Sequence, residues 1–292
     1  MARMAATFRP WRGVLGYGVF TLVAFVVALL YSLPHDLIAR RALDEATAGT
    51  PVRIAFDRVS LAFPSGYSFR GVRLVAPGPP PTAVEMDDIT IRIPLVRLLL
   101  GRIDSATFTG RLYGGSFAGS VGETDGRLAT SLTLTDVRIA PLSQRLLPPP
   151  GQVTGVASLH LELASDGRST HSAQGDFDLS IRDLELQGLV ARGFTVPDLA
   201  FATVDLKAGI QAGRVRIDRF QASGEELTIA ATGDVLIREP TAQSVLNLQL
   251  EIDVAAGERP GLRVATTLLP KRGPGQPKTW SLRGSFASPS LR

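Results

Sequence analysis

The sequence predicts a mainly β protein: one N-terminal transmembrane helix followed by a curled, repetitive antiparallel sheet with a few short helices. Three observations predict this fold class. Val14–Leu33 is an uncharged run about 20 residues long, the length with which a helix crosses a hydrocarbon core. From Val52 onward apolar residues recur at every second position, which is typical of half-buried strands. A six-residue pattern also recurs along that part of the chain, which favours a repetitive sheet.

The N-terminal run could instead belong to a cleaved signal peptide. Such a peptide has a shorter apolar region of about 7–15 residues, closed by a small-x-small cleavage site. The residues that follow the run, Leu33-Pro34-His35-Asp36, offer no such site. We therefore expect the run to stay in the protein as a membrane anchor.

The flanking arginines predict the orientation of this anchor. Three precede the run and two follow it: Arg3, Arg9 and Arg12 against Arg40 and Arg41. The positive-inside rule then places residues 1–13 in the cytoplasm. We expect a single-pass protein of the bacterial inner membrane with residues 34–292 in the periplasm.

The remaining chain divides into a short juxtamembrane helix over residues 34–50 and a β-rich domain over residues 51–292. Further short helices are predicted at Pro94–Leu100, with proline in its first turn and Gly101 at its end, and at Pro141–Leu147. The proline-rich stretch at residues 148–151 is a possible boundary between two halves of the domain, although a continuous sheet across it is the alternative.

The recurring pattern is an apolar residue, two others, and then apolar-x-apolar. It occurs as FDRVSL (56–61), FRGVRL (69–74), MDDITI (86–91), LTDVRI (134–139), IRDLEL (181–186) and IDRFQA (217–222). The middle pair is rich in Asp, Arg and Gly, which suit a bulge. A three-residue step followed by a two-residue step is expected to flip the apolar face.

Further strands are predicted over residues 107–113, 116–121, 127–135, 158–164, 175–181, 202–211, 214–222, 227–231, 233–237, 245–254, 262–268 and 279–286. Glycine-containing turns at hairpin distance separate several of them, as at Ala212-Gly213.

The composition offers little for chemistry. The chain has no cysteine, so thiolate metal sites and disulfides are excluded. Its net charge is +4 and the arginines are scattered singly, which argues against nucleic-acid binding but is compatible with anionic lipid head groups. His35, His160 and His171 have no second ligand at metal spacing. We expect no metal and no cofactor.

The glycine-rich stretch Gly110–Gly122 has no lysine after Gly119, so it is interpreted as a hairpin and not as a phosphate loop. Two acidic pairs occur, Asp87-Asp88 and Glu225-Glu226. Neighbouring residues of a strand point to opposite faces, so the two carboxylates of each pair form no dyad by themselves. No G-x-S-x-G motif occurs. With no constellation of catalytic groups, the protein is not expected to be an enzyme.

Four stretches carry a family resemblance. Val52–Ile93, the segment PLVRLLLGRI (94–103) and TGRLYGGSFAGSV (109–121) resemble the GspN family, type II secretion system protein N. The ending TWSLRGSFASPSLR (279–292) is similar to that of AsmA-like proteins. The resemblance implies an accessory component of type II secretion, anchored in the inner membrane and acting through periplasmic contacts with other secretion components. It implies no catalytic residues.

The AsmA side of the resemblance implies an alternative function, namely binding or transport of phospholipid or another envelope lipid in an apolar groove. Candidate groove residues are Ile54, Leu74, Ile91, Leu132, Leu161 and Ile229. The same residues are compatible with a closed core, for instance that of a sandwich, because both arrangements bury one face of each strand.

Overall fold

The computed structural model describes residues 53–63, 65–76, 82–93, 104–124, 126–146, 150–166, 172–191, 194–195, 197–238, 243–254 and 279–292. They form a mainly β protein built around one antiparallel sheet of 15 strands. The anchor predicted at Val14–Leu33, the juxtamembrane helix predicted at 34–50, the helix predicted at Pro94–Leu100 and the strand predicted at 262–268 lie outside these residues. Within the described part, no helix has the length and apolar character to cross a membrane.

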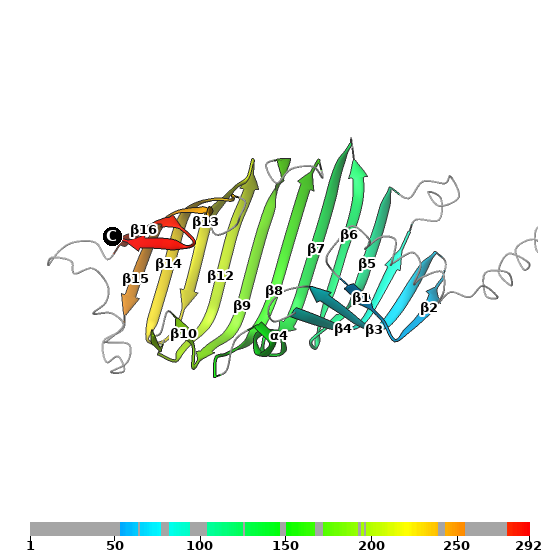
Figure 1. Ribbon diagram of the computed structural model, residues 1–292, viewed down its shortest axis with the longest axis horizontal. Coiled ribbons are helices and arrows are strands. Elements are labelled where there is room, and N and C mark those ends of the chain that lie inside the picture. The colour runs from blue at the N-terminus through cyan, green and yellow to red at the C-terminus, as the bar shows by residue number, and fades with distance from the viewer. Residues whose placement is uncertain are drawn as a thin grey trace, which may run out of the picture.

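The strands follow one another across the sheet almost in chain order (Figure 1). One half contains β1 (Arg53–Ala55), β2 (Arg58–Ala62), β3 (Gly66–Ala76), β4 (Thr82–Arg92), β5 (Ser105–Leu112), β6 (Gly115–Thr124) and β7 (Arg127–Arg138). The other contains β8 (Gln152–Ser165), β9 (Gln174–Gln187), β12 (Leu199–Gln211), β13 (Arg214–Ser223), β14 (Leu227–Leu236), β15 (Val245–Val254), β16 (Thr279–Ser285) and β17 (Ser288–Leu291). A separate two-stranded ribbon joins β10 (Val190–Ala191) to β11 (Phe194–Thr195).

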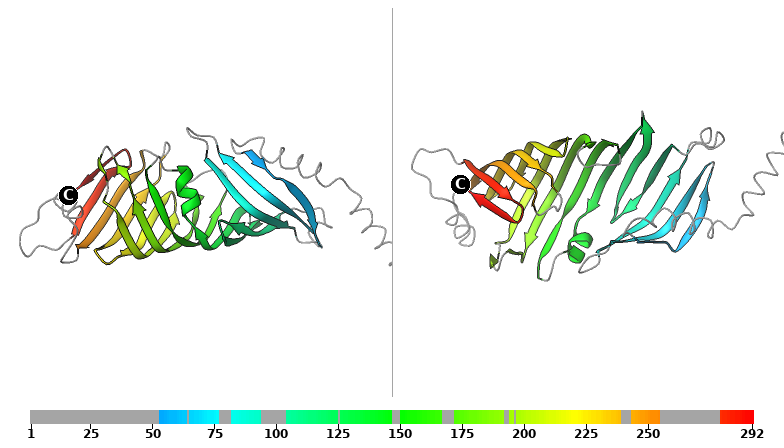
Figure 2. Two further views of the ribbon diagram at one scale, coloured as in Figure 1. Left: turned by 90° about the horizontal axis from the view of Figure 1, so that it is seen from below. Right: turned by 45° about the horizontal axis from the view of Figure 1, so that its top comes forward.

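The sheet is bent along its length into a trough (Figure 2). It is continuous between its halves, because β7 pairs with β8 from Leu128↔Ser165 to Arg138↔Val156. The proline-rich stretch at 148–151 therefore does not interrupt the sheet. Between these strands stands the helix α4 (Ala140–Leu146), close to the range 141–147 predicted for it.

Helix α4 is attached to the sheet through a buried serine. The Ser143 hydroxyl donates to the backbone oxygen of Val153 at 2.7 Å and accepts from the backbone nitrogen of the same residue at 3.3 Å. Because both polar groups of one strand residue are satisfied by this side chain, the helix is held at a fixed point on β8. It also contacts β4, so it lies along one rim of the trough (Figure 1).

Two tight hairpins confirm the turn predictions. β5 and β6 are joined by Tyr113 and Gly114, with φ of 48° and 81°. β12 and β13 are joined by Ala212 and Gly213, with φ of 52° and 74°. Positive φ at both central residues is the mark of the two-residue turn that matches strand twist. The stretch Gly110–Gly122 is thus a hairpin, as expected.

The six-residue pattern marks irregularities of the sheet. The register shifts between Leu134 and Val137 in β7 and between Ile217 and Phe220 in β13. At the third position of two other copies, Asp183 and Gly71 have φ of 51° and 60°. Bulges at this pattern were expected and occur.

The bulges at the six-residue pattern do not flip the apolar face of the strand, although this flip was expected. Ile181 and Leu184 flank the irregular Asp183, yet both pack in the same hydrophobic cluster. The extra residue of a bulge absorbs the three-residue step, so the apolar residues on both sides of it stay on one face.

One strand is longer than its sequence predicts. The segments predicted at 227–231 and 233–237 form a single strand, β14, with Gly233 inside it. Gly233 has φ of 139°, and a Cβ at this position would lie 2.2 Å from the Asn247 backbone oxygen. Glycine here permits a close approach of β15 and does not end the strand.

Candidate functional site

The inner face of the sheet, defined here by one row of paired residues, is apolar from edge to edge. Each residue of the row lies opposite the next in the strand register. The row comprises Leu61, Tyr67, Ile91, Phe108, Gly119, Leu132, Leu161, Phe177, Ala208, Ile217, Gly233, Leu248, Leu282 and Leu291. Tyr67 carries its only polar side-chain group. Such a surface offers contact with apolar ligands and almost no hydrogen bonds.

The residues that alternate with this row along each strand lie on the outer face, and they are mostly polar. The next row comprises Ser60, Ser68, Thr90, Thr109, Ala118, Thr133, His160, Asp178, Lys207 and Arg219. Its side chains bind one another across strands. Lys207 lies 3.1 Å from Asp178, and Thr133 contacts the His160 ring at 3.1 Å. His160 is thus a surface strand histidine, as expected, while His35 and His171 lie outside the described residues.

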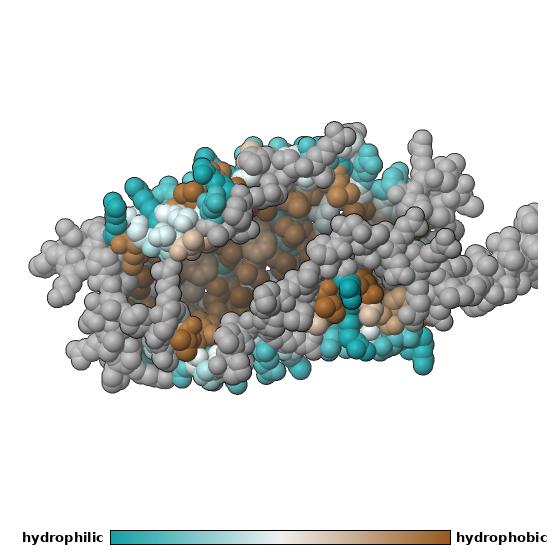
Figure 3. Space-filling model, in the orientation of Figure 1, coloured by the Kyte–Doolittle hydropathy of each residue, from teal (hydrophilic) through white to brown (hydrophobic). Residues whose placement is uncertain are grey.

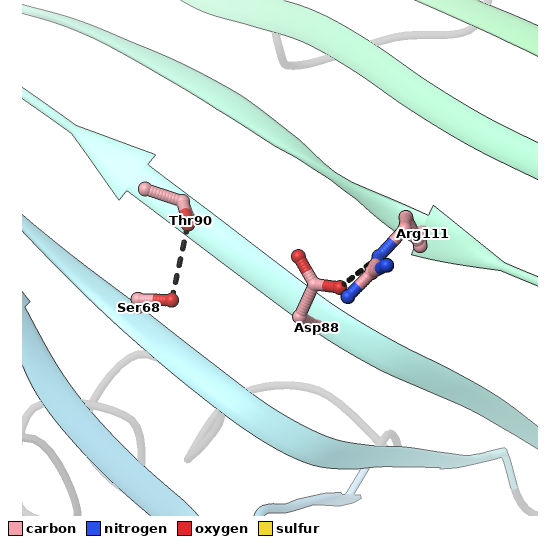
Figure 4. Close-up of polar contacts among 4 residues, drawn as sticks. All are labelled: Ser68, Asp88, Thr90 and Arg111. Atoms are coloured by element: carbon pink, nitrogen blue, oxygen red, sulfur yellow. Dashed lines mark hydrogen bonds and ion pairs between the residues drawn. The ribbon is translucent and has the colours of Figure 1, made fainter.

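Figure 4 shows the same pattern near the N-terminal end of the sheet, where the Thr90 hydroxyl donates to that of Ser68 at 3.1 Å. Arg111 donates through Nε to the Asp88 carboxylate at 2.6 Å. This hydrogen bond and the charge of Asp88 raise the pKa of Arg111 above its usual value. One member of the acidic pair Asp87-Asp88 therefore belongs to a surface ion pair.

The inner face is hollowed and open. In Figure 3 apolar residues gather along the floor of the hollow and hydrophilic residues along its rims. The most buried apolar side chains among the described residues, Val72 and Ala222, keep 3% of their surface exposed, and the largest fully buried side chain is Ser244. Leu132 and Leu161, in the middle of the row, are only half-buried. A core covered by a second layer would bury such leucines fully.

All six residues predicted to line a groove lie on this face. Ile91, Leu132 and Leu161 belong to the row itself. Ile54 pairs with Leu74 at the first strands and packs beside Phe56, Phe69 and Val72. Ile229 packs in the second hydrophobic cluster, with Phe201, Val204 and Ala222. Ligand contact by these residues stays a prediction.

The floor has a flat region over β5 and β6. Phe108 lies opposite Gly119, and Phe117 lies opposite Gly110. A Cβ added to Gly119 would lie 2.4 Å from Phe108 Cζ, and one added to Gly110 would lie 2.5 Å from Phe117 Cζ. Each ring therefore packs directly against the glycine opposite it, and the two ring centroids are 6.3 Å apart. The glycines of this hairpin thus permit both its tight turn and the close packing of the two rings on the inner face.

Another hollow, of about 1230 Å³, lies on the polar side of the C-terminal strands. Charges of both signs line it, among them Asp176, Arg216, Asp234 and Arg283. Arg216 already contacts Asp218 at 3.2 Å. This cavity is large, but its chemistry is that of a solvated surface and does not suit an apolar ligand.

A smaller hollow of about 440 Å³ gathers acidic residues that sequence reasoning did not connect: Asp183, Glu185, Asp198, Glu225 and Glu226. They come from β9, from the segment before β12 and from the turn after β13, so only the register brings them together. Within the described residues no group of three or more acidic or histidine side chains is arranged to hold a metal ion.

No protein-family model, curated protein or solved structure matches this chain.

Proposed function

We propose that the protein binds lipids by holding their acyl chains against the inner face of its sheet. The observation that carries this proposal is the apolar row that crosses the 15-stranded sheet from β2 to β17 while Leu132 and Leu161 in its middle are only half-buried. Exposed apolar area of this extent is unfavourable in water and marks a surface that is covered in function. Each methylene group buried there contributes about 0.8 kcal/mol.

The shape of the face favours a long ligand over a compact one. The row runs perpendicular to the strands and along the trough, and it is interrupted by no charged side chain. An extended acyl chain matches a continuous apolar strip, whereas a compact polar molecule would leave its hydrogen-bonding groups unpaired. In this proposal the predicted span at Val14–Leu33 anchors the protein in the inner membrane, and the lipid is a phospholipid or another envelope lipid.

The test is photocrosslinking of the full-length protein in living cells. A benzophenone amino acid replaces Leu132 or Leu161 on the inner face, or their neighbours Thr133 or His160 on the outer face. Cells grown in radioactive phosphate are irradiated, and the purified protein is examined for covalently attached phospholipid.

We expect labelled adducts at Leu132 and Leu161 and none at Thr133 and His160. The four positions form two adjacent cross-strand pairs of β7 and β8. The two pairs lie side by side in the sheet and differ mainly in the face that their side chains occupy. Equal labelling on both faces, or none on the inner face, would refute lipid binding by this face.

The role in type II secretion that the resemblance implies is a second proposal. It needs surfaces for other proteins, and the end strands of the open sheet offer them: among the described strands, β17 pairs only with β16. An unpaired strand edge can accept a strand from a partner.

Deletion of the gene distinguishes the two proposals. In a secretion component, the deletion is expected to accumulate secreted proteins in the periplasm while the outer membrane stays intact. Normal export together with an outer membrane that admits detergent or dye would contradict the secretion role and favour lipid handling.

A further inference from the structure

The turn between β2 and β3 exposes a large aromatic side chain. Phe63 keeps 80% of its surface accessible, more than any other large apolar residue of the described part. Ser65, directly before β3, is tied to the end of β4, because the Ile93 backbone nitrogen donates to the Ser65 oxygen at 2.9 Å and the Ser65 hydroxyl donates to the Ile93 oxygen. The ring is therefore held out in solvent by a hairpin that is bound to β4.

On the outer face, two arginines lie at the end of β2 and β3 that is far from this ring, and a third lies near the turn. Arg58 and Arg70 lie directly opposite each other on β2 and β3, and Arg92 lies opposite Gly66 at the base of the turn. All three arginines are exposed, and within the described residues none has an ion-pair partner. Asp88 lies directly opposite Arg70 on β4, but its carboxylate is bound to Arg111. Like charges directly opposite on paired strands are destabilising unless an anion screens them.

We infer that this hairpin docks on an anionic membrane surface, with Phe63 entering the interface and Arg58, Arg70 and Arg92 facing lipid phosphates. An exposed aromatic side chain and unpaired basic residues on one face of an element are the combination that holds proteins at the headgroup level. Basic residues near an anionic leaflet add an attraction that falls off within about 10 Å. The cluster defined by these four residues is called the docking hairpin below.

The position of the docking hairpin in the chain fits a membrane as its partner. Figure 1 places β2 and β3 at one end of the sheet and β16 and β17 at the other. The predicted span ends at Leu33 and β1 begins at Arg53. The intervening residues 34–52 reach at most about 70 Å even when fully extended. The docking hairpin thus lies at the end of the sheet that follows the predicted span in the chain, and the inference does not depend on lipid binding by the inner face.

The absence of cysteine from the chain makes a clean test possible. Ala62→Cys, beside Phe63, is labelled with an environment-sensitive fluorophore in the full-length protein, which is then reconstituted in vesicles of phosphatidylethanolamine and phosphatidylglycerol. Lipids with a nitroxide near the headgroup serve as quenchers. The test variant adds Phe63→Ser. The matched control adds Phe286→Ser, because Phe286 is also exposed, at 47%, but lies in the turn between β16 and β17.

We expect nitroxide lipids to quench the label, Phe63→Ser to abolish the quenching and Phe286→Ser to leave it unchanged. Neutralising Arg58 or Arg70 to Gln is expected to weaken docking about fivefold for each residue, and replacing phosphatidylglycerol by phosphatidylcholine is expected to weaken it further. Quenching that is absent with Phe63 in place, or that persists in Phe63→Ser, would overturn the inference. A label that is shielded in cells but is not quenched in pure lipid vesicles would assign the hairpin to a protein partner instead.

Discussion

A carboxylate introduced on the inner face, as in Leu161→Glu, is expected to abolish lipid binding. Leu161 lies in the middle of the apolar row, between Leu132 and Phe177. An acyl chain that covered the introduced carboxylate would bury an unpaired charge, and isolated buried charges cost several kcal/mol. With the photoreactive group at Leu132, we expect the yield of lipid adduct to fall at least about tenfold, since 1.4 kcal/mol already corresponds to that factor.

The control for this variant is the same substitution one residue away, His160→Glu, on the outer face. It is expected to leave the adduct yield unchanged. Limited proteolysis of both variants separates binding from folding, because an open face tolerates a half-exposed carboxylate whereas a closed core does not. Loss of protease resistance in Leu161→Glu would therefore contradict the open trough, as would equal loss of adduct in both variants.

The substitution Gly119→Ala is expected to be strongly destabilising although it adds a single methyl group. A Cβ at this position would lie 2.3 Å from the Ser131 backbone oxygen and 2.4 Å from Phe108 Cζ. The backbone of β7 and the ring that lies on the glycine would both have to shift. Overpacking of this kind costs about 1–3 kcal/mol. Denaturant unfolding of the full-length protein, followed by circular dichroism, measures the change in the free energy of unfolding.

The matched control is Gly209→Ala on β12. There a Cβ would meet only Asp176 Oδ1, at 3.9 Å, and alanine restricts the unfolded chain. This variant is expected to leave the free energy of unfolding unchanged or to raise it by about 0.4–1 kcal/mol. Similar destabilisation by both substitutions would contradict the assignment of the cost to the Phe108 ring and the Ser131 backbone oxygen.

Several features of the fold followed from local sequence alone. The alternation from Val52 predicted the strands, and glycine-containing pairs such as Ala212-Gly213 predicted their turns. The six-residue pattern predicted bulges because an irregular step in the apolar period needs an extra residue in the strand. Gly233 misled the prediction, since one glycine within a strand is as compatible with a close approach of backbones as with a turn.

The candidate site was predictable only in part. Half-buried residues such as Leu132 and Leu161 could be assigned to the apolar face of their strands, because side-chain alternation is a local property. Their alignment in one row could not, since it depends on the register of every strand pair, and each bulge changes that register. The pair Arg58 and Arg70 and the acidic hollow around Asp183 and Glu226 arise in the same way from residues distant in the sequence.

The sequence by itself therefore determined that this protein is built from strands with one apolar and one polar side, and where those strands bend and turn. The tertiary structure alone decided that the strands join in one continuous sheet across residues 148–151 and that the leucines of its inner face are only half-buried. The physical reason is that alternation specifies which side of a strand avoids water, whereas the path of the whole chain decides what covers that side.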